Sequence, residues 1–196
     1  MVRMLKNKWT LFVSLSLICG GIILAASEIN LARMLKEAQT NYEQGKYFDS
    51  YMKLRAASLD VWSKCPLTLH NVHFVVDEPA AFGMYNPRPN AVFKRGEIIR
   101  VYMEPIGFTI KQQGGFKQFS LSTDFNILDA EGNVLAGKRN FGTFPFKSRS
   151  HITQFMLNLT YTLTGAEPGK YKIETVVRDN FSPKRASIIQ DIEIMP

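Results

Sequence analysis

The chain has 196 residues, of which 45% are hydrophobic and 12% aromatic. This composition supports a hydrophobic core, so it excludes an intrinsically disordered chain and fits one domain with an appendage or two small domains. The formal charge is +7, but Arg3, Lys6 and Lys8 lie at the N-terminus, and the remaining 21 basic and 17 acidic residues leave +4. So mild an excess, without a run of basic residues, disfavours nucleic acid as a partner.

Residues 1–27 have the pattern of a signal peptide. Their basic start is followed by an uncharged apolar run over residues 9–24 and by the small residues Ala25, Ala26 and Ser27. We predict cleavage near Ser27 and export to the periplasm or to the outer face of the inner membrane. The alternative is an uncleaved anchor, because residues 9–26 are about long enough to span a bilayer. In that case the chain contacts the membrane only through this segment, and the rest is still exported.

The two cysteines predict no internal disulfide in the mature protein. Cys19 lies in the N-terminal apolar run, so Cys65 would remain alone after cleavage. The fold must then be stabilised by packing, and Cys65 is expected to be a small buried or boundary residue.

Residues 28–64 are predicted to form a helical hairpin. Apolar residues recur at spacings of three and four, Gly45 interrupts the run, and Pro66 prevents its continuation. Residues 41–62 resemble a single tetratricopeptide repeat, with matching positions at Tyr42, Gly45, Tyr47, Ser50, Leu54 and Ala57. Since a solenoid needs about three repeats, we expect the hairpin to pack on its neighbour or act as a spacer. Docking of a partner helix is the alternative.

From Leu67 the hydrophobic period changes to two, which is typical of strands. Seven strands are predicted, at residues 67–76, 98–104, 116–128, 134–136, 154–163, 171–178 and 186–195. Asp129 and Gly132 belong to a hairpin turn between the third and fourth of these. Many short antiparallel strands joined by turns predict a mainly β fold, with residues 67–196 forming an antiparallel sandwich of about seven strands.

One motif supports an immunoglobulin-like form of this sandwich. Glu167, Gly169 and Tyr171 alternate before a strand and resemble the tyrosine corner of immunoglobulin-like domains. The resemblance implies structural roles for Gly169 and Tyr171, with the tyrosine hydroxyl bonded to backbone a few residues upstream. Ile173 stands where antibody domains have a cysteine, which agrees with the missing disulfide. Otherwise the chain resembles an exported bacterial protein.

Two aromatic and basic segments are the candidate binding sites. Residues 77–90 form a predicted loop that is rich in proline and glycine, and residues 140–149 form a second predicted loop. Aromatic and guanidinium groups are common in recognition surfaces. The candidate binding residues are Phe82, Tyr85, Arg88, Phe141, Phe144 and Arg149. The alternative for the first loop is that its aromatics cap one end of the core.

No catalytic or metal-binding motif is found in the sequence. His70 and His73, three apart on a predicted strand, are expected on opposite faces, where they cannot share a metal without a bend. His151 lies far along the chain, and no general base is placed next to a nucleophile. We therefore expect no enzyme activity, no cofactor and no metal.

The function predicted from the sequence is that of an exported, non-catalytic binding module. Its partner is expected to be another envelope protein, held by the sheet edges or by the two loops. The alternatives are a small exported hydrolase that uses His151 or His70, and a structural envelope subunit anchored by an uncleaved N-terminus.

Overall fold

The computed structural model describes residues 30–196, so the predicted signal peptide lies outside the described residues. The chain divides into two compact units, with the division between Val61 and Trp62. None of the helices in residues 30–196 is long and apolar enough to cross a membrane.

The N-terminal unit contains a helical hairpin, as the spacing predicted. One helix covers residues 30–43 and α2 covers Tyr47–Lys64. Gly45 adopts φ +71° in the connection, a conformation that glycine accepts without strain. Ala38 and Ser50 are buried, and the Ser50 hydroxyl donates to the Ala38 carbonyl at 2.8 Å. Small residues thus hold the two helices together.

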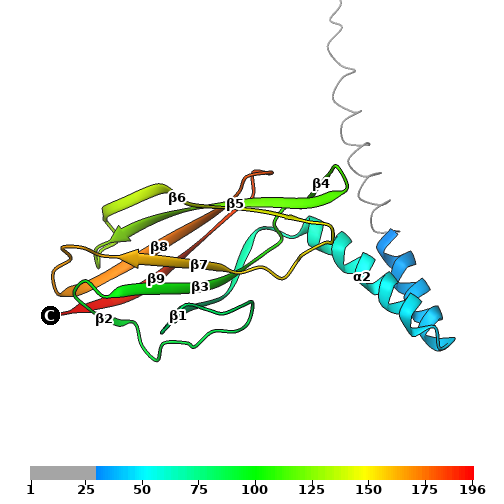
Figure 1. The fold of residues 1–196 in the computed structure, drawn as a ribbon, viewed down its shortest axis with the longest axis horizontal. Coiled ribbons are helices and arrows are strands. Elements are labelled where there is room, and N and C mark those ends of the chain that lie inside the picture. Colours follow the sequence, from blue (N-terminus) through cyan, green and yellow to red (C-terminus); the bar gives the residue numbers. More distant parts are fainter. Residues whose placement is uncertain (1–29) are drawn as a thin grey trace, which may run out of the picture. The chain divides into compact units, whose positions relative to one another are not determined.

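Nine strands are present among the described residues, in two sheets (Figure 1). They are β1 (Thr68–Val75), β2 (Val92–Lys94), β3 (Ile98–Ile106), β4 (Lys111–Gln113), β5 (Phe116–Leu128), β6 (Val134–Ser148), β7 (Leu157–Thr162), β8 (Gly169–Asp179) and β9 (Arg185–Met195). The smaller sheet has the order β1-β3-β7 and the larger one the order β2-β9-β8-β5-β4, with β6 paired to β5. All pairs are antiparallel except β2 with β9.

The predicted mainly β fold is confirmed, and its core lies between the two sheets. Alternate residues of β3 and β7 point inward, among them Val101 and Leu159, and meet inward residues of β5 and β8 such as Leu121 and Ile173. All four are almost fully buried. Side chains of the opposite parity point away from this core, which is why the sequence shows a period of two.

One polar contact crosses the core. The Tyr161 hydroxyl on β7 and the Thr175 hydroxyl on β8 lie 2.7 Å apart and are both buried. Burial raises the pKa of Tyr161 to about 12, so this phenol stays protonated and can serve the hydrogen bond.

Several strand boundaries differ from the sequence-based prediction, and two of them involve a proline. The predicted loop over residues 140–149 was wrong, because β6 continues to Ser148. Gly142 and Pro145 lie within this strand and interrupt the pattern that predicts one. β3 also runs past Pro105 to Ile106, although proline is expected to end a strand. Pro105 is paired with Leu69 of β1, but β7 pairs with β3 only as far as Met103, so Pro105 has a strand neighbour on one side only, as is usual for proline in a sheet.

The connection between β7 and β8 carries the predicted hydrogen bond of Tyr171. Its hydroxyl donates to the carbonyl of Glu167, four residues upstream, at 2.9 Å. The same segment takes the chain from the smaller sheet to the larger one. The assignment of a tyrosine corner stays a prediction.

Gly107, which follows β3, lies close to the backbone of the segment that precedes β1, and a substitution there can test this close approach. It adopts φ +81°, and a Cβ there would lie 2.3 Å from the carbonyl oxygen of Pro66. Gly107→Ala should therefore cost backbone strain of about 1–2 kcal/mol and a similar or larger cost from the clash, about 1–3 kcal/mol. The measurement is the free energy of unfolding in denaturant. Gly165→Ala is the control, because Gly165 has φ +82° with open space around it. Equal losses in the two variants would contradict the close approach.

Candidate functional site

A β-bulge in β1 brings two histidines to one face of the smaller sheet. His70 pairs with Glu104 and His73 pairs with Tyr102, with a register shift between the two histidines. Asn71 lies at the shift with φ +47°. Because a bulge inserts one extra residue, residues three apart point to the same side. The predicted placement on opposite faces was therefore wrong.

The outer face of β3 carries a buried polar pair. Tyr102 and Glu104 alternate with the core residues of that strand, so they point away from the sandwich interior. Both are nevertheless buried, Tyr102 completely and Glu104 to all but 7%. The Tyr102 hydroxyl donates to Glu104 Oε1 at 2.7 Å, and the Asn71 side-chain amide donates to Oε2 at 2.9 Å. The carboxylate is therefore satisfied on both oxygens.

The loop of residues 77–90 covers this pair. Its Gly83 backbone N–H donates to the Tyr102 hydroxyl at 2.7 Å. Burial, followed by the hydrogen bond to Glu104, raises the pKa of Tyr102 to about 12. The phenol thus remains protonated at neutral pH, donating to the carboxylate and accepting from the loop.

Three stacked rings attach the loop to the sheet. The Tyr85 ring lies between Tyr102, at a centroid distance of 4.2 Å, and His73, at 5.3 Å, with interplanar angles of 26° and 22°. Such pairs contribute about 0.5–1.5 kcal/mol beyond their buried area. Tyr85, predicted as a binding residue, is half-buried and acts as an anchor of the loop.

The base of the loop is closed by backbone and side-chain hydrogen bonds. The Val76 N–H donates to the Asn86 carbonyl at 3.0 Å, and the Arg88 N–H donates to the Phe74 carbonyl at 2.8 Å. The Asn86 side-chain amide also donates to the Asp77 carboxylate, at 3.0 and 3.3 Å. Because these hydrogen bonds hold its two ends together, the segment forms a compact surface loop.

The outward side of the loop forms a shallow recess of about 400 Å³. Two carboxylates, a thioether and an aromatic ring line it, from Asp77, Glu78, Met84 and Tyr85. Met84 is 61% exposed, and Phe82, two residues earlier in the loop and outside the lining of the recess, is 37% exposed. The recess therefore combines negative charge with apolar and aromatic surface, which suits a positively charged group carried on an apolar stem.

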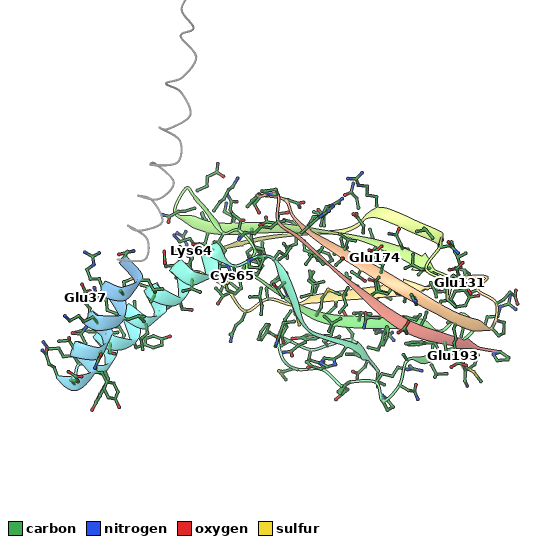
Figure 2. The ribbon with its side chains drawn as sticks, turned by 180° about the vertical axis from the view of Figure 1, so that it is seen from behind. Glu37, Lys64, Cys65, Glu131, Glu174 and Glu193 are labelled. Atoms are coloured by element: carbon green, nitrogen blue, oxygen red, sulfur yellow. The ribbon has the colours of Figure 1, made fainter. Side chains whose placement is uncertain are left out.

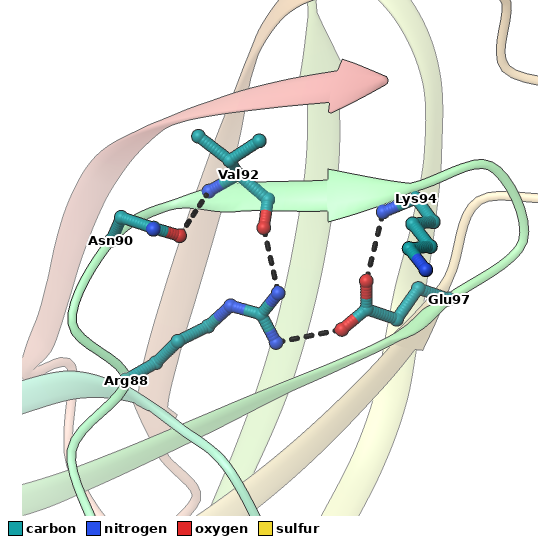
Figure 3. Close-up of polar contacts among 5 residues, drawn as sticks. All are labelled: Arg88, Asn90, Val92, Lys94 and Glu97. Atoms are coloured by element: carbon teal, nitrogen blue, oxygen red, sulfur yellow. Dashed lines mark hydrogen bonds and ion pairs between the residues drawn. The ribbon is translucent and has the colours of Figure 1, made fainter. Parts of the chain in front are cut away.

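Arg88, another predicted binding residue, is engaged within the protein (Figure 3). Its guanidinium donates to Glu97 Oε1 at 2.6 Å and to the Val92 carbonyl at 2.7 Å, and lies 4.3 Å from the centre of the Phe93 ring. Glu97 also accepts the Lys94 N–H at 2.8 Å. That backbone hydrogen bond, together with Arg88, lowers the pKa of the Glu97 carboxyl below its ordinary value. Arg88 thus fixes the end of the loop.

The other predicted binding residues belong to β6 and its end. Phe141 packs against Phe125 and stacks on Tyr161 at 5.4 Å, and Phe144 packs against the core. Arg149 is exposed, with its guanidinium 4.7 Å from the centre of the Phe116 ring. The structure thus divides the six predicted residues between the 77–90 loop and the β6 edge.

The histidines have different environments. His70 Nδ1 lies 4.0 Å from Glu104 Oε2, beyond hydrogen-bonding distance, with its side chain 61% exposed. His151 lies between β6 and β7. Within residues 30–196 no group of three or more His, Cys, Asp or Glu side chains is placed to hold a metal ion. Chemically, the cluster around Tyr102 holds a loop and offers no activated nucleophile.

Sequence analysis missed Tyr102, Glu104 and the bulge. The available signals were Asn71, because asparagine is enriched at positive φ, and Glu104, an acidic residue in an otherwise apolar strand. Neither signal specifies that residues 77–90 fold back over that strand.

The fold defines a β-sandwich protein with an N-terminal helical hairpin. No family model matches the chain, and no curated protein matches it in sequence.

Solved structures show weak likeness only. The chain is similar to a CARDB domain from Pyrococcus furiosus, in complex with di-metal ions, at 13% identity over 66% of this chain and 90% of that one, with a TM-score of 0.33. Superoxide reductase (neelaredoxin) from Ignicoccus hospitalis has 9% identity over 65% and 82%, with a TM-score of 0.34. A sporulation control protein from Bacillus subtilis has 12% identity over 67% and 50%, with a TM-score of 0.35. Scores this low carry no argument about function.

Removal of the Tyr102 hydroxyl should loosen the loop. Tyr102→Phe leaves the Gly83 N–H and one Glu104 oxygen without their partner, so we expect a loss of about 1–3 kcal/mol in the free energy of unfolding. Denaturant unfolding measures it. Tyr85→Phe is the matched control, since it keeps the stacked ring, and its loss should be much smaller. Equal effects of the two substitutions would contradict the role of the Tyr102 hydroxyl.

The Arg88–Glu97 pair predicts a stability difference that depends on pH. Because the pKa of Glu97 is lowered in the folded protein, its contribution is present above about pH 4.5, the ordinary value, and is lost as the pH falls through the folded value. Glu97→Gln should cost about 1–2 kcal/mol at pH 7. Measured in denaturant at several pH values, the gap between wild type and variant should narrow below pH 4.5. A gap independent of pH would refute this assignment.

Proposed function

We propose that this chain is an exported, non-catalytic binding module that holds a partner protein on the 77–90 loop. The observation that carries the proposal is the acidic and aromatic recess on a loop whose backbone is fixed to the sheet by Gly83 and Tyr85. A preorganised loop loses little conformational entropy on binding, which favours recognition.

Export is part of the same proposal. It rests on residues 1–27, whose basic start, apolar run and small residues are typical of a signal peptide. An exported module meets other proteins of the cell envelope, so we propose one of these as the partner.

The chemistry of the recess indicates what the partner presents. Asp77 and Glu78 supply negative charge, and Met84 supplies exposed apolar surface. A lysine or arginine side chain fits both, because its stem packs on apolar groups while its charge meets the carboxylates. Arg88 does not cancel this charge, since its guanidinium is paired with Glu97.

The test is affinity capture of the exported protein from envelope extract, with partners identified by mass spectrometry. Glu78→Lys combined with Met84→Ala should abolish capture of a specific partner, because the first substitution repels a basic side chain and the second removes apolar contact. Both residues are exposed, so the fold should be retained.

The matched control is Glu131→Lys combined with Ile189→Ala. Glu131 lies in the β5–β6 turn at one end of the sandwich (Figure 2), and Ile189 is an exposed residue of β9. This control makes the same change of charge and a comparable loss of apolar surface away from the loop, and it should leave capture intact. Equal capture of the partner by the loop variant and by the wild type would contradict the proposal.

A further inference from the structure

β6 is an edge strand of the larger sheet, paired on one side only. Its partner is β5, over the β5 residues Lys117 to Leu128, and no other strand in the described part of the chain pairs with it (Figure 1). It is also the longest of the described strands, with 15 residues. Because one side of β6 faces no strand, its outward N–H and C=O groups are free to pair with another chain.

The first part of β6 is the accessible part of this edge. Residues 134–140 are all exposed, with Val134 at 62% and Leu135 at 56%. At Asn140 the strand bulges, with φ +52°, and the Asn140 N–H donates to Asp124 Oδ1 at 2.7 Å. Further on, Pro145 has no N–H to donate. Strand pairing is thus confined to residues 134–139, within which a second register shift lies at Leu135, between Val134 and Ala136.

The edge is uniformly basic. Lys138, Arg139 and Lys147 lie in β6 and Arg149 follows it, whereas residues 134–149 contain no aspartate or glutamate. Asp124, whose carboxylate accepts the Asn140 N–H, is paired with Arg178 at 2.9 Å. The charges of Lys138 and Arg139 are therefore available to a ligand.

A second copy of this chain is a poor occupant of the edge. Pairing residues 134–139 of two copies with each other brings together two segments with positive charges and no negative ones, and like charges across a strand pair are destabilising. An incoming strand that carries carboxylates gains attraction in place of repulsion.

We propose that residues 134–139 of β6 bind an acidic, extended peptide segment of a partner protein by adding it to the sheet as a further strand. Backbone hydrogen bonds supply affinity, and Lys138 and Arg139 select negative charge. This surface lies on another sheet from the 77–90 loop, so the inference does not depend on the function proposed above.

The experiment uses the chain from residue 28 onward and a fluorescent hexapeptide, Val-Thr-Glu-Glu-Val-Thr. Anisotropy measures the dissociation constant, and amide hydrogen exchange shows which residues become protected. Two control peptides are used. One has lysine in place of glutamate, and the other is the acidic peptide with alternate backbone nitrogens methylated, which removes donors and keeps the charge.

We expect the acidic peptide to bind and to protect amides within residues 134–139, and both control peptides to bind at least tenfold more weakly. Lys138→Glu combined with Arg139→Glu should weaken binding of the acidic peptide at least tenfold. Lys170→Glu combined with Arg185→Glu makes the same charge change at exposed positions of β8 and β9 and should have little effect.

Three results would overturn the proposal. One is no binding of the acidic peptide, in which case the basic residues serve to keep the edge unpaired. Another is equal binding of the methylated peptide, which would mean attraction by charge without strand pairing. The third is protection outside residues 134–139 or dimerisation of the chain through β6.

Discussion

The hydroxyl of Tyr102 is the contact on which the candidate site depends. It accepts the N–H of Gly83 from the loop and donates to the carboxylate of Glu104 on the same strand. The bond to Glu104 is buried and the bond from Gly83 is partly buried, and an unpaired polar group in such surroundings is costly. The bulge at Asn71 completes the arrangement, because it turns His73 towards Tyr85 and supplies the amide that satisfies Glu104. A long loop is thereby held as part of the sheet's outer surface.

The sandwich presents two surfaces of opposite character. The 77–90 loop offers carboxylates beside Met84, while the β6 edge offers Lys138 and Arg139 beside unpaired backbone. The first is suited to a basic side chain and the second to an acidic strand. The net charge of the described part is small, so the overall composition says little about binding partners. The separation of negative and positive charge between the two surfaces says more about them.

The sequence predicts those structural features that a local pattern determines. It does not predict those that depend on contacts between distant parts of the chain. Alternation along β5 and β8 predicts the strands and the sandwich, because each inward residue must meet the core. By contrast, β6 was predicted as a loop over residues 140–149, since Gly142 and Pro145 break its pattern and only pairing with β5 holds it extended.

The site residues show the same limit. Tyr85 and Arg88 were selected as exposed recognition groups, but stacking on Tyr102 and pairing with Glu97 turn both towards the protein. These partners lie on β3 or just before it, so loop composition could not reveal them. Composition did indicate that residues 77–90 form a long loop rich in aromatic residues. In the structure Phe82 lies on the exposed part of this loop.

The central claim is that the 77–90 loop is a fixed, preformed surface, and hydrogen exchange of the Gly83 amide in the native protein tests it most directly. We predict strong protection of this N–H, close to that of amides in β3, because it is bonded to a buried hydroxyl. Exchange at the rate of an unstructured peptide would show that the loop is open in solution and would contradict the account.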